Sequence, residues 1–399
     1  MDQRFRSLFN EQFTPELYDF YQRELSSRLH STFEFRLAES PVFLTDDFKQ
    51  RAVESATAIV EQLSDPATIA RMKAAIPERW DTPGMDTLPN FSQVDFAVVN
   101  ENGTLVPKLI ELQGFPSLTA LQVIQRDAWK DTLAKMNGLD VAWSCWFSGY
   151  DREAFLDLAR RTIVGKQDPR EVILMDIDPP RQKTFPDFSA TKLLFDVDAI
   201  DPTTLVKRGK QLFRADGTPV RRIYNRVVFD ELISKGIELP FDYREELDVE
   251  WTPHPNWYWV WSKYSLPFLA HESVPNATFV SELKRIPDDL SRYVLKPLFS
   301  FAGGGVNVEP TRADVEAIPA SERHAWCLQE KIEYEPALQA ADGGGVKIEI
   351  RMMFLRPDDE EKPILAQNLI RLSRGKMLGV DFNKQFTWVG SSVGLSITS

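Results

Sequence analysis

A lysine followed by three consecutive glycines is the feature of this chain that most restricts its fold. In residues 294–306 an apolar run carries Lys296 and then reaches Gly303, Gly304 and Gly305. Lysine places a mobile positive charge beside the loop, and glycine lets backbone N–H groups approach an oxyanion closely. The segment matches neither G-x-x-x-x-G-K-S/T nor G-x-G-x-x-G, which argues against P-loop and dinucleotide-binding folds. It predicts a glycine-rich hairpin over the phosphates of ATP, and the alternative is an ordinary turn.

The segments on both sides of this loop carry further residues suited to a nucleotide. Lys263 lies upstream within residues 259–264, and we expect both lysines on strands. Downstream, an apolar strand is expected to end in Gln329, Glu330, Lys331 and Ile332. Two lysines, a glycine loop and such a strand, in this order, resemble the nucleotide contacts of ATP-grasp enzymes.

The resemblance can be narrowed to one branch of that group. The motifs between residues 255 and 395 look like the C-terminal half of eukaryotic-type glutathione synthetase; they are 295–297, 303–305, 330–332, 368–371 and 389–394. No Glu-x-Asn motif follows them before Ser399. The resemblance therefore implies that the metal ligands lie upstream, as in the circularly permuted members, glutathione synthetase and glutathionylspermidine synthetase.

Upstream, residues 109–118 resemble the metal strand and substrate loop of those families. In an extended strand Glu111 and Gln113 share one face, and two oxygen ligands on one face suit Mg²⁺. Asp95 precedes them on a strand that resembles the families' Asp-Phe strand. We expect a Mg²⁺ site at Glu111, with Gln113 and Asp95 assisting; the alternative is an exposed strand face.

Three positions depart from the family pattern. Gln113 stands where the family has its metal-binding asparagine, and Gln93 replaces an arginine of the glutathionylspermidine synthetases. Phe301 and Ala302 occupy the place of an acidic residue before the triple glycine.

The resemblance implies roles for four further residues. Arg226, in a Tyr-x-Arg segment, and Ser117 would contact the substrate, Glu349 the ATP ribose and Arg371 the transferred phosphoryl group. The alternatives are an ion pair of Arg226 with Asp230 or Glu231, a plain turn for Ser117, and surface salt bridges for Glu349 and Arg371. Glu349 and Arg351 alternate with isoleucines on one expected strand, and Arg371 follows on the next. Asp381 and Asn383, beside the glycine-punctuated segments expected to close over the γ-phosphate, offer a rival Asp-x-Asn metal pair.

Three domains are expected along the chain. Residues 1–85 read as helices opened by Thr14 and Thr45, and residues 86–250 as the metal-ligand strands followed by an α/β substrate-binding domain with strands near 171–175, 192–195 and 223–228. Residues 251–399 would form the ATP-binding region. An Asn-Gly turn at 102–103 predicts a hairpin, in which an irregularity at 100–108, near Pro107, would bring Asp95 opposite Glu111.

Composition limits the class of partner. Lys plus Arg number 47 against 59 Asp plus Glu, and this net charge of −12 argues against nucleic-acid or anionic-membrane partners. The two cysteines, Cys145 and Cys327, lie in apolar runs and are expected to be buried thiols. The first residues lack an apolar signal region and no long apolar run occurs, so we expect a cytoplasmic protein.

The expected fold class is therefore α/β (α+β): a circularly permuted ATP-grasp fold with an α/β domain like that which precedes ATP-grasp domains, and N-terminal helices. The expected function is an ADP-forming carboxylate–amine ligase that uses ATP and Mg²⁺ on small-molecule substrates, with a homodimer as an open option. The alternative is a nucleotide-binding or regulatory protein that has kept the fold and lost catalysis.

Overall fold

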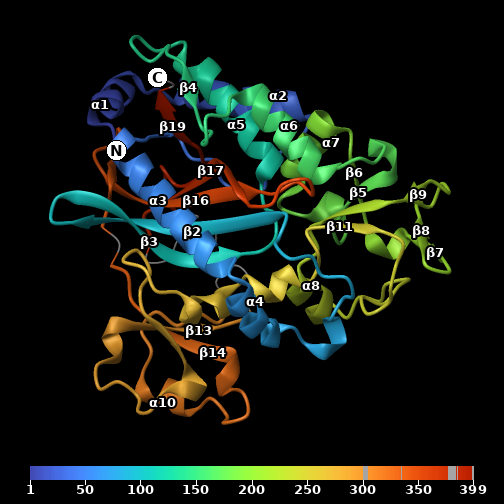
Figure 1. Cartoon of the computed structure of the whole chain (residues 1–399). Coiled ribbons are helices and arrows are strands. Elements are labelled where there is room, and N and C mark those ends of the chain that lie inside the picture. Colours follow the sequence, from blue (N-terminus) through green and yellow to red (C-terminus); the bar gives the residue numbers. More distant parts are fainter. Residues whose placement is uncertain (300–303, 334, 376–382, 384, 398–399) are drawn as a thin grey trace.

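A six-stranded antiparallel sheet forms the centre of the molecule (Figure 1). The computed structural model describes residues 1–299, 304–333, 335–375, 383 and 385–397. The sheet order is β18-β17-β16-β2-β3, and β15 adds to β16. Its strands are β2 (Phe91–Glu101), β3 (Thr104–Gln113), β15 (Leu338–Gln339), β16 (Gly345–Leu355), β17 (Ile364–Ser373) and β18 (Gly390–Ser392).

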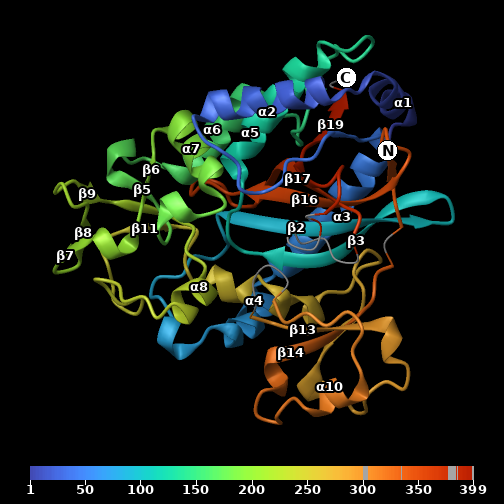
Figure 2. The same cartoon turned by 180° about the vertical axis from the view of Figure 1, so that it is seen from behind.

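The N-terminal segment is helical, and α3 packs on the apolar face of this sheet. Its helices are α1 (Gln3–Gln12), α2 (Pro15–Leu29), α3 (Asp46–Leu63) and α4 (Pro66–Met72). The hydroxyls of Thr14 and Thr45 accept the N–H groups of Leu17 and Phe48, so both expected helix starts are confirmed. Helix α3 crosses the strands in Figure 1 and shares a hydrophobic core with their inward side chains. In Figure 2 the sheet is seen from the side opposite α3.

The β2–β3 hairpin contains a bulge that sets the register of the site. Asn102 and Gly103 both have positive φ, as the predicted turn requires, and Phe96 pairs with Leu109. Asp95 nevertheless pairs with Glu111, so Ile110 is the extra residue. The expected juxtaposition of Asp95 and Glu111 is confirmed, but the irregularity lies at 109–111 and not at 100–108. The extra residue, Ile110, also makes a tertiary contact that is described below.

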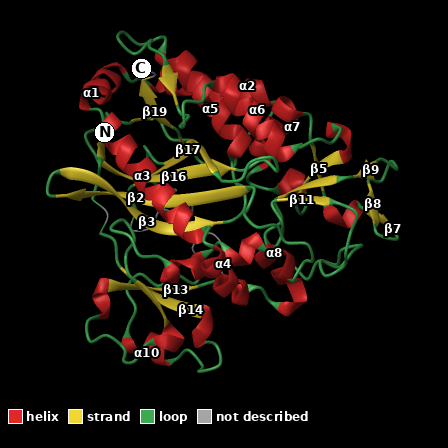
Figure 3. Ribbon diagram, viewed as in Figure 1, coloured by secondary structure: helices red, strands yellow, loops and turns green. Residues whose placement is uncertain are grey.

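A four-stranded parallel sheet lies beside the central sheet (Figure 3). Its order is β11-β10-β5-β6, and the strands are β5 (Val172–Met175), β6 (Asp198–Ile200), β10 (Arg222–Asn225) and β11 (Glu250–Thr252). The accompanying helices are α5 (Thr119–Leu133), α6 (Arg152–Ile163), α7 (Phe185–Phe195) and α8 (Phe229–Ser234).

The strand expected at 192–195 is wrong, because these residues form the last turn of α7. A short apolar run cannot distinguish a buried helix from a buried strand. Here the helix begins with Pro186 in its first turn, and Thr191 donates its hydroxyl to the Asp187 carbonyl one turn earlier.

Three small sheets complete the described fold. One has the order β1-β19-β4 and another β7-β8-β9; their strands are β1 (Val42–Phe43), β4 (Trp143–Ser144), β19 (Gly394–Ile397), β7 (Val206–Arg208), β8 (Gln211–Phe213) and β9 (Pro219–Val220). The third, β12-β14-β13, lies below the central sheet in Figure 1 with α10 (Arg312–Glu316) on its outer face. Its strands are β12 (Ala277–Phe279), β13 (Tyr293–Pro297) and β14 (Trp326–Glu330).

The expected domain division stays a prediction. The central sheet takes β2 and β3 from residues 86–250 and β16 and β17 from residues 251–399, so its core joins these two segments. Within the described parts of the chain, no helix combines the length and apolar character that crossing a membrane requires.

Candidate functional site

The polar face of the central sheet carries charged side chains on three adjacent strands. Arg351 of β16 pairs in register with Asp95 of β2, and Asp95 pairs with Glu111 of β3. Side chains alternate along strands, so these three lie on one face, while Val94, Phe96 and Ile350 belong to the core under α3. With Glu349 and Arg371, which pair across β16 and β17, they form what we call the strand-face cluster: Asp95, Glu111, Glu349, Arg351 and Arg371.

Two arginines hold the carboxylate of Asp95 at the centre of this cluster. Arg351 donates Nε to Oδ1 at 2.6 Å and Nη2 to Oδ2 at 2.5 Å. Arg371 also donates Nη2 to Oδ2. Burial opposes the ionised form, but the two guanidinium groups outweigh it and hold the pKa of Asp95 below its usual value. Asp95 is therefore an ionised, fully buried group whose two oxygens are both engaged.

Glu349 and Arg371 form a second ion pair of the cluster. Burial raises the pKa of Glu349 to about 7, although Arg371 favours its charged form. The Glu349 side chain is 4% exposed, whereas that of Arg371 is 31% exposed. Arg371 thus connects a buried carboxylate to an open part of the cluster. The role of Glu349 toward a ribose stays a prediction.

Glu111 and Gln113 lie at the edge of the cluster, where the sheet ends. Gln113 donates Nε2 to Glu111 Oε1 at 3.2 Å, and its own Oε1 is buried without a hydrogen-bond partner among the described residues. Glu111 keeps 21% of its side chain exposed. One accessible carboxylate beside an unsatisfied amide oxygen fits a Mg²⁺ ion that takes its other ligands from phosphates and water. No group of three or more His, Cys, Asp or Glu with metal-binding geometry occurs among the residues that the structure describes.

Lys296 approaches this edge from the third small sheet. It donates Nζ to the carbonyl of Ile110 at 2.9 Å, which is the bulged residue next to Glu111. On the same face of that sheet, Gln329 places Nε2 3.5 Å from the Leu109 carbonyl. Burial lowers the pKa of Lys296, and the charge of Glu111 opposes this shift. The outer edge of β3 is thus contacted by side chains from β13 and β14. Lys296, a cation of the kind that binds phosphate, lies next to the segment of Glu111, the expected metal ligand.

Lys263 is buried close enough to influence Lys296 electrostatically, since its charge contributes to the lowered pKa of Lys296. The expected strand around it is wrong. Residues 257–260 form α9 (Trp257–Val260), and Lys263 begins a 3₁₀-helix that Ser262 caps. The aromatic run packs into the core, where Gly114 comes so close that a Cβ would lie 2.4 Å from the Trp257 carbonyl. This contact fixes the start of the loop after Gln113.

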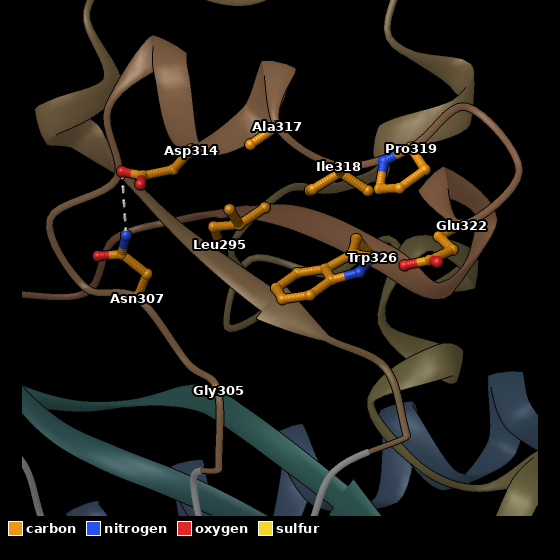
Figure 4. Close-up of a pocket in the computed structure, with 9 residues that line it drawn as sticks. All are labelled: Leu295, Gly305, Asn307, Asp314, Ala317, Ile318, Pro319, Glu322 and Trp326. Carbon is orange, nitrogen blue, oxygen red and sulfur yellow. Dashed lines mark hydrogen bonds between the residues drawn. The ribbon is translucent and has the colours of Figure 1, made fainter.

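The described glycines of the loop lie where β13 leaves the sheet. Gly303 lies outside the described residues; Gly304 is exposed, and Gly305 has φ +70°, which favours glycine. Gly305 also lines a hollow of about 380 Å³ between β13, β14 and α10, into which Leu295 and Trp326 point (Figure 4). Leu295 and Lys296 point to opposite faces of β13. This hollow is therefore separate from the face that carries Lys296.

The remaining residues of the Gln-Glu-Lys-Ile motif lie away from the strand-face cluster. Glu330 points to the face opposite Gln329 and accepts two hydrogen bonds from Asn276, at 3.3 Å and 3.0 Å. Lys331 and Ile332 follow the end of β14, and the Lys331 N–H bonds to the Arg292 carbonyl. Of this motif, only Gln329 is brought to the edge of β3.

Arg226 pairs with a residue that the sequence analysis did not consider. Its Nη1 lies 2.5 Å from Asp187 Oδ2, so the alternative partners Asp230 and Glu231 were wrong. The other oxygen of Asp187 accepts the N–H groups of Ala120 and Leu121 at the start of α5. Arg226 thus supports the helix that follows the loop of Ser117, and Ser117 itself uses its carbonyl to accept a bond from Gln93.

The rival metal pair is only partly described. Asp381 lies outside the described residues. Asn383 accepts the backbone N–H groups of Arg374 and Gly375 through Oδ1, at 3.0 Å and 2.8 Å. Its amide oxygen therefore organises the end of β17.

Arg351 and Asp187 were assigned no role by sequence reasoning, yet each holds one of the charged groups together. The alternation of Glu349 and Arg351 on an otherwise apolar strand was a usable signal, because buried charges require partners. Asp187 gave no such signal.

Comparison with known proteins supports the fold. No family model matches the chain, and no curated protein matches it. Among solved structures, a glutathione synthetase-like effector from Globodera pallida in its apo form aligns with 96% of this chain and 96% of its own, at a TM-score of 0.59 and 13% identity. The chain has a glutathione synthetase-like fold. At this identity the likeness shows the fold alone.

Proposed function

We propose that the protein is an ATP-grasp ligase of the permuted type, which joins a small-molecule carboxylate to an amine with formation of ADP. The observation that carries this proposal is the contact of Lys296 with the Ile110 carbonyl beside Glu111. Lys296 is a cation suited to binding phosphate, and Glu111 is a carboxylate suited to binding Mg²⁺. The contact brings their segments together although Lys296 and Ile110 are 186 residues apart in the sequence. Such a pair is what transfer of a phosphoryl group from ATP requires.

The proposed roles are carried by residues of the central sheet and of the β12-β14-β13 region. Lys296 and Lys263 would neutralise phosphate charge, and Glu111 with Gln113 would hold Mg²⁺, which neutralises and orients phosphates when bound. Arg371, whose side chain is partly exposed, would stabilise charge on the phosphoryl group as it moves to the substrate carboxylate. An amine would then attack the acylphosphate carbon, and phosphate would leave as the amide forms.

The substrate side is proposed at the loop after β3. Ser117 lies in this loop, and α5 starts directly after it. Arg226 acts through Asp187, which accepts two N–H groups of α5, so we assign Arg226 to positioning the loop. This proposal replaces the expectation that Arg226 contacts the substrate directly.

An assay of ADP release with mixed amino acids, dipeptides and polyamines tests the ligase proposal. ADP should appear only when a suitable carboxylate is present, and hydroxylamine should trap that acid as a hydroxamate. Free phosphate and ADP without hydroxamate or amide would contradict the proposal.

A catalytically altered nucleotide-binding protein is the second candidate. The observation that favours it is the engagement of Arg371 by both Glu349 and Asp95, which neutralises the cation that catalysis would use. This candidate predicts ATP binding without turnover in the same assay.

A further inference from the structure

The guanidinium of Arg351 is paired with one, and lies near the other, of two carboxylates that the sequence suggests as ligands of one metal ion. Arg351, Asp95 and Glu111 are consecutive partners across β16, β2 and β3. The guanidinium is bidentate on Asp95, at 2.6 Å and 2.5 Å, and its Nη2 lies 4.0 Å from Glu111 Oε1. A divalent ion coordinated by Asp95 would have to compete with this guanidinium for the two carboxylate oxygens.

The surroundings of Arg351 make it a permanent part of the cluster. Its side chain is 4% exposed and that of Asp95 is fully buried. A planar bidentate pair is the strongest geometry available to these groups, and removing one partner from a buried pair is costly. Asp95 also accepts a bond from Arg371, so both of its oxygens are used before any ion arrives.

Glu111 differs from Asp95 in each of these respects. It keeps 21% of its side chain exposed, and Arg351 Nη2 lies 4.0 Å from its Oε1, beyond hydrogen-bond distance. Its direct hydrogen-bond partner is Gln113, whose own buried oxygen has no partner among the described residues. The open side of the cluster is therefore at Glu111 and Gln113.

We propose that Arg351 is a built-in cation of the site, which keeps Asp95 from coordinating a metal and limits this face to one divalent ion, held by Glu111 and Gln113. Asp95 is then a positioning residue that orients Arg351 and Arg371. The inference rests on the proposed function for the presence of the ion, and it departs from the expectation that Asp95 is a ligand.

Binding of Mn²⁺ without nucleotide, followed by electron paramagnetic resonance on the full chain, tests this assignment independently of catalysis. The wild-type chain should bind one Mn²⁺. Glu111→Gln should weaken binding at least about tenfold, because a charged oxygen ligand is lost, whereas Asp95→Asn should change it less than about threefold. Arg351→Met should add a second Mn²⁺, and the double variant R351M/D95N should lose that second ion.

The matched control is Arg356→Met, which breaks the buried pair of Arg356 with Asp86, at 2.8 Å, away from Glu111. It should still bind one Mn²⁺. If Arg351→Met does not fold, Asp95→Asn decides: loss of Mn²⁺ as large as in Glu111→Gln would overturn the inference. A folded Arg351→Met chain that still binds one ion, or a wild-type chain that binds none, would also overturn it. If the Mn²⁺ results are as expected but the chain shows no ligase activity, the proposed function is contradicted and the inference about Arg351 stands.

Discussion

The strand-face cluster and the Arg226–Asp187 pair are both groups of buried charges, but they differ in what their charges contact. In the strand-face cluster, Glu111 and Arg371 keep 21% and 31% of their side chains exposed. Arg226 and Asp187 keep 5% and 0%. The second oxygen of Asp187 accepts two backbone N–H groups at the start of α5, so both of its carboxylate oxygens have partners within the protein. The Tyr-x-Arg segment thus carries an arginine that is buried against Asp187, whereas the strand-face cluster keeps two charged side chains partly exposed.

The largest difference between the two regions should appear in stability. We expect Arg226→Met to lower the free energy of unfolding by about 3–5 kcal/mol, since it leaves Asp187 buried and unpaired. Arg371→Met should cost only about 1–2 kcal/mol. Asp95 would still be paired with Arg351, and Glu349, whose pKa is about 7, can take up a proton. Urea unfolding at pH 7 measures both. Equal losses would remove the distinction between the regions.

The second effect concerns ligand affinity. Lys296→Met should weaken ATP binding by about 1.5–3 kcal/mol, since a charge-assisted contact is lost. The same variant should be as stable as the wild type or more so, because burial already disfavours the ammonium form of Lys296. Calorimetric titration and thermal unfolding provide the two readouts. Lys108→Met is the control: Lys108 lies on β3 and pairs with Glu101, so its loss should leave ATP affinity unchanged.

How far the sequence predicts this arrangement depends on the range of the contacts involved. The helix caps at Thr14 and Thr45 and the Asn-Gly turn are local, and they were predicted correctly. A bulge in this hairpin was predicted correctly, but it was expected near Pro107. The extra residue is Ile110, whose carbonyl accepts a hydrogen bond from Lys296. The partner of Arg226 was missed because Asp187 precedes it by 39 residues and lies on a different element. Register and pairing across segments are tertiary properties that local signals do not contain.

The smallest effect is a pH dependence in the region of Arg226. Burial raises the pKa of Asp176, which follows β5, to about 7. The folded state therefore holds a proton that the unfolded state releases near pH 4, and stability from this group is lost as pH rises toward 7. Asp176→Asn should remove that loss, so its stability relative to wild type should rise by roughly 1–2 kcal/mol between pH 5 and pH 6.5. Urea unfolding at the two pH values measures this, with exposed Asp248→Asn as the control. A relative stability that stays constant or falls with pH would show that Asp176 is charged in the folded protein.

The most direct test of the account is a crystal structure with Mg²⁺ and a non-hydrolysable ATP analogue. The account predicts that the phosphates lie between Lys296 and Glu111, with a Glu111 oxygen about 2.1 Å from the metal and Arg351 still bidentate on Asp95. Nucleotide bound in the hollow beside α10, or metal held by Asp381 and Asn383 with Glu111 uninvolved, would contradict it.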